Sequence, residues 1–338
     1  MRLDIGLVGA TRIAERVVLH PAARHDDVTV RAVAASDHDR ALAFAARNGI
    51  PVVHDHYADL IADPRINTVY ISLHNSAHAG WAERAARAGK HVVVEKPLCL
   101  TPGELGRIRE AAAEHGVRVA EALPSAGHPW QAAVREMIAD RRYGPLRSIR
   151  TEIAFTTPAP GTYRTRPELG GGIFYDCAGY WLQAVQATAG LDGVSGEGRT
   201  VREAAATGDG IGVDLALHAG LRWADGRHAD LDCRFGDRHV ADHEFVFATA
   251  TVRVRGFLRP IAGPLPVNLA IRRPGAGTRI RSFAPAAYYD RQFASIRDLL
   301  TTGDGGEGRE LAAAAPRIAV MAAIHRGAAR DGREAAVR

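Results

Sequence analysis

The chain has 338 residues, of which 46% are hydrophobic, so it is long enough to bury a large core and to form two domains. Its 43 Lys and Arg against 38 Asp and Glu leave a net charge of only +5, and the arginines are scattered, which argues against a nucleic-acid partner. No apolar stretch is long enough to cross a bilayer, and Asp4 interrupts the first apolar run, so we expect neither a membrane span nor a secretory signal. The 15 histidines show no metal-binding spacing, so no metal is expected. Three widely separated cysteines fit a reducing compartment, which favours a cytoplasmic protein.

The first strand is predicted over Leu3–Val8, and a glycine turn, Gly9-Ala10-Thr11-Arg12-Ile13-Ala14, leads from it into a helix. A strand, a tight turn and a helix form the context in which the pyrophosphate of a dinucleotide rests on a helix N-terminus. The glycine fingerprint is incomplete, because Thr11 stands where the middle glycine is expected. Its hydroxyl could donate to a phosphate instead. An ordinary strand-to-helix turn explains the same residues, and the motif alone does not separate the two interpretations.

A second strand is predicted over Val28–Ala35 and is followed by Ser36-Asp37-His38-Asp39-Arg40. An acidic residue after the second strand usually binds the adenosine ribose, whereas a nearby arginine accommodates a 2′-phosphate. Asp37 and Arg40 provide both residue types, so this segment is compatible with either NAD or NADP as the cofactor. The alternative is a polar cap on the alanine-rich helix 40–48.

A third strand, Asn67–Leu73, ends at His74-Asn75-Ser76-Ala77-His78, before a helix that closes at Gly89. In the simplest interpretation Asn75 or Ser76 caps that helix, and His78 is a surface residue of its first turn.

The run Val92-Val93-Val94-Glu95-Lys96-Pro97 predicts a fully buried parallel strand that the proline ends. It places Lys96 at the carboxyl end of the strand, where open α/β sheets bind ligands. A lysine that merely extends to solvent from a strand end would give the same pattern. Thr101-Pro102-Gly103-Glu104 is a capping box that opens a helix to about Gly116, and a further strand follows over 117–122. The alternation of strand and helix predicts a doubly wound parallel sheet.

After Ala122 the alternation stops, and we predict two domains, 1–122 and 123–338. The second begins with a strand over 146–155 and a helix over 173–188. Long alternating segments separated by turns then predict a large, mostly antiparallel open sheet, which makes this an α+β domain. These segments are 211–223, 228–235, 243–257 and 265–273, and helices over 286–301 and 309–330 complete the chain.

Asp176 and Tyr180 lie four residues apart on the helix that follows Gly170-Gly171-Gly172, so they share one face. The glycines allow the helix N-terminus to come very close to another backbone or to a ligand. A capped, partly exposed side of a helix would account for the same pair.

Taken together, these motifs occur in the order of one family, and the chain resembles the Gfo/Idh/MocA oxidoreductases. The resemblance runs from about residue 3 to residue 190, and the strand that ends in Glu95-Lys96-Pro97 and the Asp176-x-x-x-Tyr180 helix are its most specific parts. Three positions depart from the family pattern: Thr11 replaces a glycine, Leu73-His74 replaces Thr-Pro, and Ala178 replaces a glycine.

The resemblance implies an N-terminal Rossmann domain that binds NAD or NADP, and a C-terminal domain whose open sheet binds substrate and pairs subunits into a homodimer or homotetramer. It assigns catalysis to Lys96, Tyr180 and Asp176, with Tyr180 as the group that transfers a proton. It places His128, Tyr163 and Arg164 near the substrate, and Tyr163-Arg164 is closest to the ketoreductase branch. The residues expected to contact the cofactor are Gly9, Ala10, Thr11, Arg12, Ile13, Ser36, Asp37, Arg40, Leu73, His74, Asn75, His78, Glu95 and Lys96.

These expectations define an enzyme that transfers a hydride between nicotinamide and a hydroxyl or carbonyl carbon of a sugar, sugar nucleotide or cyclic polyol. A lysine beside a positively charged ring should have a lowered pKa. An imine reductase of natural-product biosynthesis and a catalytically silent NAD(P)-binding regulator are the alternatives.

Overall fold

The computed structural model describes residues 1–203, 212–302 and 308–336. The chain forms two compact units, Met1–Pro124 with Tyr289–Ala315, and Ser125–Tyr288 with Pro316–Arg338. This division differs from the expected domain 123–338, because Tyr289–Ala315 returns to the first unit. The reason is apolar packing: Phe293 and Leu300 of helix α9 (Tyr288–Thr302) belong to the hydrophobic core of the first unit.

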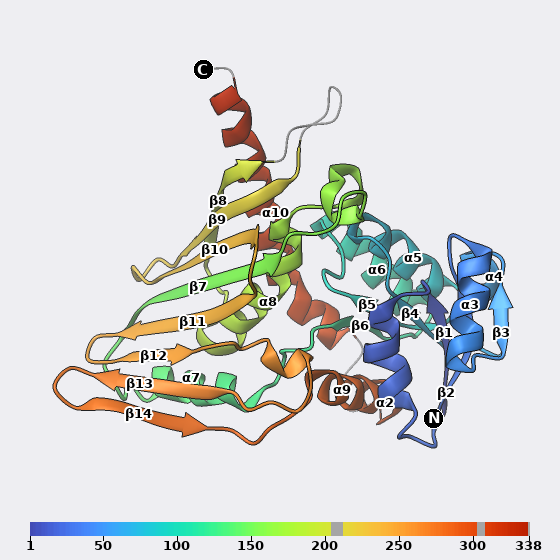
Figure 1. The fold of residues 1–338 in the computed structure, drawn as a ribbon, viewed down its shortest axis with the longest axis horizontal. Helices are drawn as coiled ribbons and strands as arrows, with labels where there is room; N and C mark the ends of the chain where they lie inside the picture. The colour runs from blue at the N-terminus through green and yellow to red at the C-terminus, as the bar shows by residue number, and fades with distance from the viewer. Residues whose placement is uncertain (204–211, 303–307, 337–338) are drawn as a thin grey trace. The chain divides into compact units, whose positions relative to one another are not determined.

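The first unit contains a six-stranded parallel sheet with the strand order β3-β2-β1-β4-β5-β6 (Figure 1). The order reverses between β1 and β4, and ligands of open α/β sheets bind at such a switch point, beyond the carboxyl ends of the strands. The predicted doubly wound parallel sheet is therefore confirmed. Its strands are β1 (Leu3–Val8), β2 (Val28–Ala34), β3 (Val52–His54), β4 (Thr68–Ile71), β5 (His91–Glu95) and β6 (Val119–Ala122).

Buried β-branched residues explain these strands, because a strand covered on both faces carries an uninterrupted apolar run. Val92, Val93 and Val94 are all buried, as the sequence predicts. Thr101 and Glu104 form the predicted capping box at the start of α6. Besides α9, the helices of this unit are α1 (Arg12–Ala14), the π-helical η1 (Glu15–Leu19), α2 (His20–Ala22), α3 (His38–Asn48), α4 (Tyr57–Ala62), η2 (Asn75–Ala77), α5 (His78–Arg87) and α6 (Pro102–Glu114).

The second unit contains an eight-stranded sheet with the order β14-β13-β12-β11-β7-β10-β9-β8. All neighbouring strands are antiparallel except β7 and β10, so the predicted mostly antiparallel sheet is confirmed (Figure 1). The expected single strand 243–257 is wrong, because the chain turns back after Phe247 and pairs with itself. Residue 211, the expected start of another strand, lies outside the described residues. The strands are β7 (Leu146–Thr156), β8 (Ser195–Glu203), β9 (Asp214–Arg222), β10 (His228–Gly236), β11 (Val240–Phe247), β12 (Thr251–Val254), β13 (Asn268–Arg273) and β14 (Gly277–Ser282).

One face of this sheet is apolar and packs against helix α8, which contacts β7, β9 and β10. The opposite face carries cross-strand ion pairs, among them Arg150 and Arg253 on either side of Glu244. Alternating burial along β10 and β11 produces the two faces. The remaining helical elements of the second unit are α7 (Pro129–Ala139), η3 (Tyr163–Thr165), η4 (Pro167–Leu169), α8 (Ile173–Ala189) and η5 (Arg259–Ile261), and α10 (Arg309–Ala336) begins in the first unit and ends in the second.

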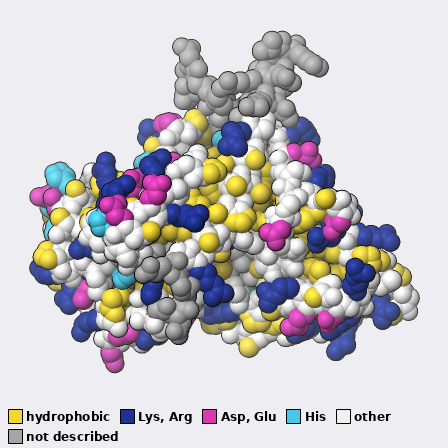
Figure 2. Space-filling view, turned by 180° about the vertical axis from the view of Figure 1, so that it is seen from behind, with side chains coloured by type: hydrophobic (Ala, Val, Ile, Leu, Met, Phe, Trp, Pro, Cys, Tyr) yellow, Lys and Arg dark blue, Asp and Glu magenta, His cyan; other side chains and the backbone are white. Residues whose placement is uncertain are grey.

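Basic and acidic side chains are interspersed on the face of the molecule drawn in Figure 2, and no continuous basic stripe crosses it. Within residues 1–203, 212–302 and 308–336, no helix combines the length and the apolar character that a membrane span needs.

Candidate active site

The turn after β1 depends on Gly9, which has φ +113°. A Cβ at this position would lie 2.6 Å from the carbonyl oxygen of Ser72, the residue after β4, so a side chain cannot be accommodated without a backbone shift. Gly9 therefore lets the ends of β1 and β4 approach each other at the switch point of the sheet.

Thr11 caps the helix that follows, because its Oγ1 accepts a hydrogen bond from the backbone N–H of Ala14 at 3.2 Å. The same hydroxyl lies 2.8 Å from Oγ of Ser72. Thr11 thus links the β1 turn to the β4 turn, a contact that the middle glycine of a complete fingerprint could not make. Direct donation from Thr11 to a phosphate stays a prediction. Of the other residues in the motif, Ala10 and Ile13 pack against the hydrophobic core and Arg12 is exposed.

After β2, the carboxylate of Asp37 accepts the backbone N–H of Arg40 at 2.7 Å and caps α3, so the capping interpretation of Asp37 is confirmed. Arg40 Nη2 donates to Oγ of Ser36 at 3.1 Å. All three side chains are exposed at the carboxyl end of β2, where the adenosine ribose of a dinucleotide would lie. The choice between NAD and NADP stays open.

After β4, Asn75 is buried and begins the short helix η2, and His74 Nδ1 lies 3.0 Å from Oγ of Ser76. Neither Asn75 nor Ser76 caps α5, whose N-cap position is Ala77 without a side-chain hydrogen bond. The expected surface position of His78 is also wrong, because its side chain is 1% exposed. Its two ring nitrogens face backbone carbonyls, and this contact holds the ring inside the unit.

At the end of β5, Glu95 accepts a hydrogen bond from the hydroxyl of Tyr70 at 2.8 Å. Burial raises the pKa of Glu95, and burial together with the nearby carboxylate raises the pKa of Tyr70 well above its ordinary value. Lys96 follows directly and is partly buried. The turn after it is held by Glu121, whose Oε1 accepts the backbone N–H of Leu98 at 3.0 Å. Glu95 thus binds a tyrosine within the sheet, and its predicted contact with the cofactor stays a prediction.

In the second unit, the glycines before α8 allow a close backbone approach. A Cβ on Gly171 would lie 2.6–2.8 Å from the carbonyl oxygens of Tyr163, Arg164 and Arg166. The N–H of Gly171 donates to Arg166 O at 3.0 Å, and the N–H of Gly172 donates to Arg164 O at 2.9 Å. The loop that carries Tyr163 and Arg164 is consequently fixed against the start of the helix.

Asp214 on β9 supplies the cap of α8 from a distant part of the sequence. Its Oδ2 accepts the backbone N–H of Phe174 at 2.8 Å, and a Cβ on Gly172 would lie 2.0 Å from its Oδ1. A carboxylate at a helix N-terminus also interacts favourably with the helix dipole. Sequence reasoning missed Asp214, because no local pattern joins residues 40 positions apart.

Asp176, in the first turn of α8, is 2% exposed and accepts a hydrogen bond from Arg164 Nε at 2.5 Å. Arg164 also lies over the ring of Tyr163, 4.6 Å from its centroid. Burial lowers the pKa of Arg164, but Asp176 together with Tyr163 and Tyr180 outweighs it, and the net pKa is raised. Tyr180, one turn along, is 7% exposed and meets Phe155 edge-on at 6.4 Å. The expected partly exposed helix side is therefore wrong: α8 is buried around this pair, and a buried, paired carboxylate is rarely placed for stability alone.

His128 is the N-cap of α7, and its Nδ1 accepts the backbone N–H of Trp130 at 3.3 Å. The ring is 2% exposed and contacts Phe283 and Tyr288 edge-on. Its predicted substrate contact stays a prediction. Among the predicted site residues, those for the cofactor and Lys96 belong to the first unit, and Asp176, Tyr180, Tyr163, Arg164 and His128 belong to the second.

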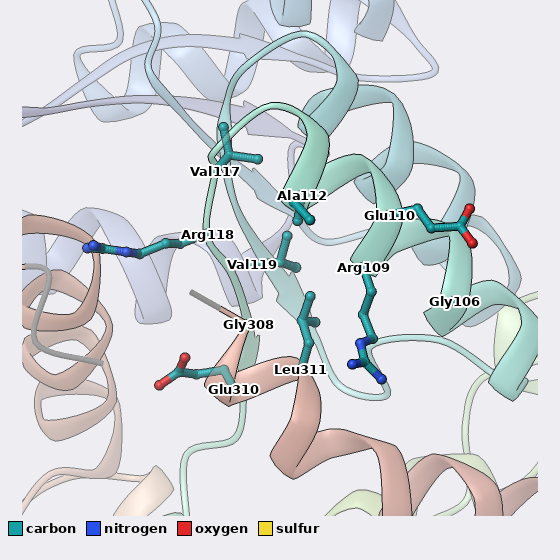
Figure 3. Close-up of a pocket in the computed structure, with 11 residues that line it drawn as sticks. Gly106, Arg109, Glu110, Ala112, Val117, Arg118, Val119, Gly308, Glu310 and Leu311 are labelled. Carbon is teal, nitrogen blue, oxygen red and sulfur yellow. The ribbon is translucent and has the colours of Figure 1, made fainter. Parts of the chain in front are cut away.

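A cavity of about 570 Å³ lies in the first unit between α6, the start of β6 and the start of α10 (Figure 3). Its lining includes Arg109, Arg118 and Glu310. Arg118 Nη1 donates to the carbonyl of Leu299 near the end of α9. Because β6 begins here, this cavity lies at the amino edge of the sheet, opposite the edge where Gly9 and Lys96 lie, and it is not the dinucleotide site.

The parallel sheet with this strand order, and the glycine turn at its switch point, define a dinucleotide-binding protein. Residues 3–123 match the family model described as "Oxidoreductase family, NAD-binding Rossmann fold", and residues 131–253 match "GFO/IDH/MocA C-terminal domain". The chain belongs to the Gfo/Idh/MocA oxidoreductase family. The predicted family and cofactor class, NAD or NADP, are confirmed.

Three curated relatives are 30–35% identical to the chain. An uncharacterized oxidoreductase ORF334 of Rhizobium meliloti is 33% identical over 67% of this chain and 66% of its own length. A dTDP-3,4-didehydro-2,6-dideoxy-alpha-D-glucose 3-reductase of Streptomyces antibioticus is 35% identical over 54% of this chain and 56% of its own. A D-xylose 1-dehydrogenase (NADP(+)) of Haloferax volcanii is 30% identical over 68% of this chain and 69% of its own length. The chain thus spans between about half and about two thirds of these relatives.

Solved structures share the fold over nearly the whole chain. The 3-ketoreductase KijD10 of Actinomadura kijaniata, in complex with NADP and TDP-benzene, has a TM-score of 0.88 and 22% identity over 97% of this chain and 98% of its own. GenD2 from gentamicin A biosynthesis, in complex with NAD, has a TM-score of 0.78 and 22% identity over 98% of this chain and 95% of its own.

Proposed function

We propose that the protein is an NAD(P)-dependent oxidoreductase that acts on a hydroxyl or carbonyl carbon of a sugar, with a sugar nucleotide as the first candidate substrate. The observation that carries the proposal is the ion pair between the partly exposed Arg164 and the buried Asp176, which lies one turn from the buried Tyr180 on α8. Such an arrangement holds one positive charge and one phenol near each other in a site sheltered from water. The resemblance to a dTDP-sugar 3-reductase supports the choice of substrate.

The first unit fits the cofactor because Gly9, with φ +113°, forms a tight turn at the switch point of the sheet, and the helix that Thr11 caps begins directly after it. When bound, the nicotinamide supplies or accepts the hydride. We assign Gly9 and the Thr11–Ser72 contact to the pyrophosphate side, and the exposed Ser36 and Arg40 to the adenosine ribose.

Lys96 polarises the substrate carbonyl in this proposal, and the hydroxyl of Tyr180 donates a proton to the same oxygen during reduction. General acid catalysis of this kind contributes on the order of a hundred- to ten-thousand-fold in rate. Asp176 fixes the guanidinium of Arg164 next to Tyr180, which favours negative charge on the developing alkoxide.

The lysine content supports a specific role for Lys96. Among 43 Lys and Arg residues, only Lys90 and Lys96 are lysines. Lys90 is buried, and its Nζ donates to the carbonyls of Asp63 and Ile66 at 2.9 and 2.7 Å, so its amine has a structural role. Lys96 is the other position where the chain keeps an amine, and an amine changes its pKa far more readily than a guanidinium.

The experiment measures oxidation of NADPH and NADH by the purified full chain with dTDP-keto-sugars, free keto-sugars and cyclic imines. We expect turnover with a keto-sugar substrate, and loss of turnover in Tyr180→Phe while the variant still binds the reduced cofactor. Turnover of cyclic imines alone would identify an imine reductase. Cofactor binding without turnover of any substrate would identify a regulator, and either result would overturn the proposal.

We also propose that the protein acts in the cytoplasm as a homodimer or homotetramer paired through the C-terminal sheet. The ion-paired outer face of that sheet, with Arg150, Glu244 and Arg253, supports a polar rather than an apolar contact.

A further inference from the structure

His78 connects two loops at the carboxyl edge of the parallel sheet. It is the first residue of α5, and its Nδ1 lies 2.8 Å from the carbonyl oxygen of Pro97. Its Nε2 lies 3.2 Å from the carbonyl oxygen of Leu73. Pro97 directly follows Lys96, and Leu73 precedes His74 and Asn75.

The sheet itself does not hold these loops together. The pairing of β4 with β5 ends at Ile71 and Val94, so the residues beyond them have no ladder hydrogen bonds to each other. His78 lies just past this end and spans the gap. On its other side the loop after Lys96 is tied to β6 through Glu121 and Leu98.

The ring can donate to only one of the two carbonyls at a time when it is neutral. Burial and, to a smaller extent, the charges of Lys96 and His74 lower the pKa of His78 to about 4, although both carbonyl contacts act in the opposite direction. At neutral pH one tautomer therefore donates to Pro97 O and the other to Leu73 O. The shorter contact, to Pro97, favours the tautomer with the proton on Nδ1.

We propose that His78 is a positioning residue that holds Lys96 in register with the Leu73–Asn75 loop, because it donates from the start of α5 to the carbonyl of Pro97 while its other ring nitrogen faces the carbonyl of Leu73. This rests on the proposed function for Lys96. His78 touches neither the substrate nor the reacting atoms in this proposal. It acts through the backbone of the residue that follows Lys96.

The test uses the two lysines as reporters. Acetic anhydride in limiting amount labels exposed amines, and mass spectrometry measures the labelling rates of Lys96 and Lys90 separately in the full chain. In His78→Leu we expect Lys96 to react about threefold faster or more, because local opening exposes its partly buried side chain, while the rate of Lys90 stays unchanged. His78→Gln keeps a donor of similar reach, and we expect it to restore part of the wild-type rate.

The matched control is His91→Leu. His91 lies at the amino end of the same strand, and its Nδ1 accepts the backbone N–H of Arg118 at 3.0 Å, so the variant removes a comparable ring-to-backbone bond at the opposite edge. We expect it to lower stability without changing the labelling of Lys96. In turnover, His78→Leu should lower kcat about ten- to a hundredfold at saturating cofactor, the usual effect of a misplaced catalytic group.

Unchanged labelling of Lys96 in His78→Leu, or an equal change in His91→Leu, would overturn the proposal and leave His78 with a role in folding only. Should His78→Leu fail to fold, the labelling rate of Lys96 in His78→Gln is compared with that of the wild type, and an unchanged rate would overturn the proposal in the same way. The labelling rate of Lys96 does not depend on turnover. A wild-type protein without activity would therefore refute the proposed function, but the labelling rates would still test the positioning role of His78.

Discussion

The start of α8 gives a sharp prediction through Gly172→Ala. Gly172 has φ +102° and ψ 158°, a conformation that is nearly restricted to glycine. A methyl group there would lie 2.0 Å from Oδ1 of Asp214, so the carboxylate must move and lose its hydrogen bond to Phe174 N–H. The substitution therefore combines backbone strain with the loss of a helix cap.

The two costs have different magnitudes. Backbone strain of this kind costs about 1–3 kcal/mol, and loss of a charged helix cap costs about 1–2 kcal/mol. We expect Gly172→Ala to lower the free energy of unfolding by about 2–5 kcal/mol, the sum of those ranges. Because Asp176 and Tyr180 lie on the first turns of the same helix, kcat should also fall about tenfold or more.

Gly190→Ala is the matched control at the other end of α8. Gly190 has φ +79° and ψ 164°, and a Cβ there meets no atom within 4 Å, so the variant introduces strain alone. Urea denaturation measures the free energy of unfolding of both variants, in the wild-type background and in an Asp214→Ala background. The comparison isolates the contact between residue 172 and the carboxylate of Asp214. We expect Gly172→Ala to cost about 1–2 kcal/mol more than Gly190→Ala, and this excess to disappear without the carboxylate. Equal losses for the two variants in the wild-type background would refute the reasoning.

Three further predictions concern charge. Asp176→Asn removes the partner of Arg164, and steady-state kinetics should show kcat/KM about ten- to a hundredfold lower; unchanged kinetics would contradict the assigned role. Burial lowers the pKa of His243 from 6.5 to about 3, so between these values the unfolded chain binds a proton that the folded chain does not, and stability falls as the pH falls. Urea denaturation at about pH 7.5 and about pH 5 should show that His243→Asn loses about 2 kcal/mol less than the wild type on acidification, and equal losses would be inconsistent with a neutral buried ring. The proposed homodimer or homotetramer, paired through a charged face, should dissociate in light scattering as the salt concentration rises, because interactions between charges are screened; a monomer already at low salt would rule out pairing through the sheet.

Local signals predicted much of the fold. The valine run before Lys96, the capping box of Thr101 and Glu104, and the glycine turn at Gly9 all depend on residues within a few positions of one another, and the structure confirms each element. Short or unusual elements were missed, among them the three-residue β3 and helix α7, which starts at Pro129 in a stretch interpreted as a break.

The candidate site was harder to predict, because its decisive contacts join distant residues. Asp214 reaches the start of α8 from another strand, and Tyr70 binds Glu95 across two strands. His78 was expected at the surface, since its place in a first turn says nothing about the loop after Lys96 that covers it. The same limit explains why helix α9 was assigned to the second domain although Phe293 packs in the first unit.

The most direct test of the account follows the hydride. The wild-type protein is incubated with NADPH or NADH that carries deuterium at both C4 positions of the nicotinamide and with a dTDP-keto-sugar, and the product is analysed by mass spectrometry. The account predicts one deuterium on the new carbinol carbon, and a rate that falls strongly in Tyr180→Phe and Lys96→Ala while both variants still bind the reduced cofactor. A product without deuterium, or equal rates in all three proteins, would contradict it.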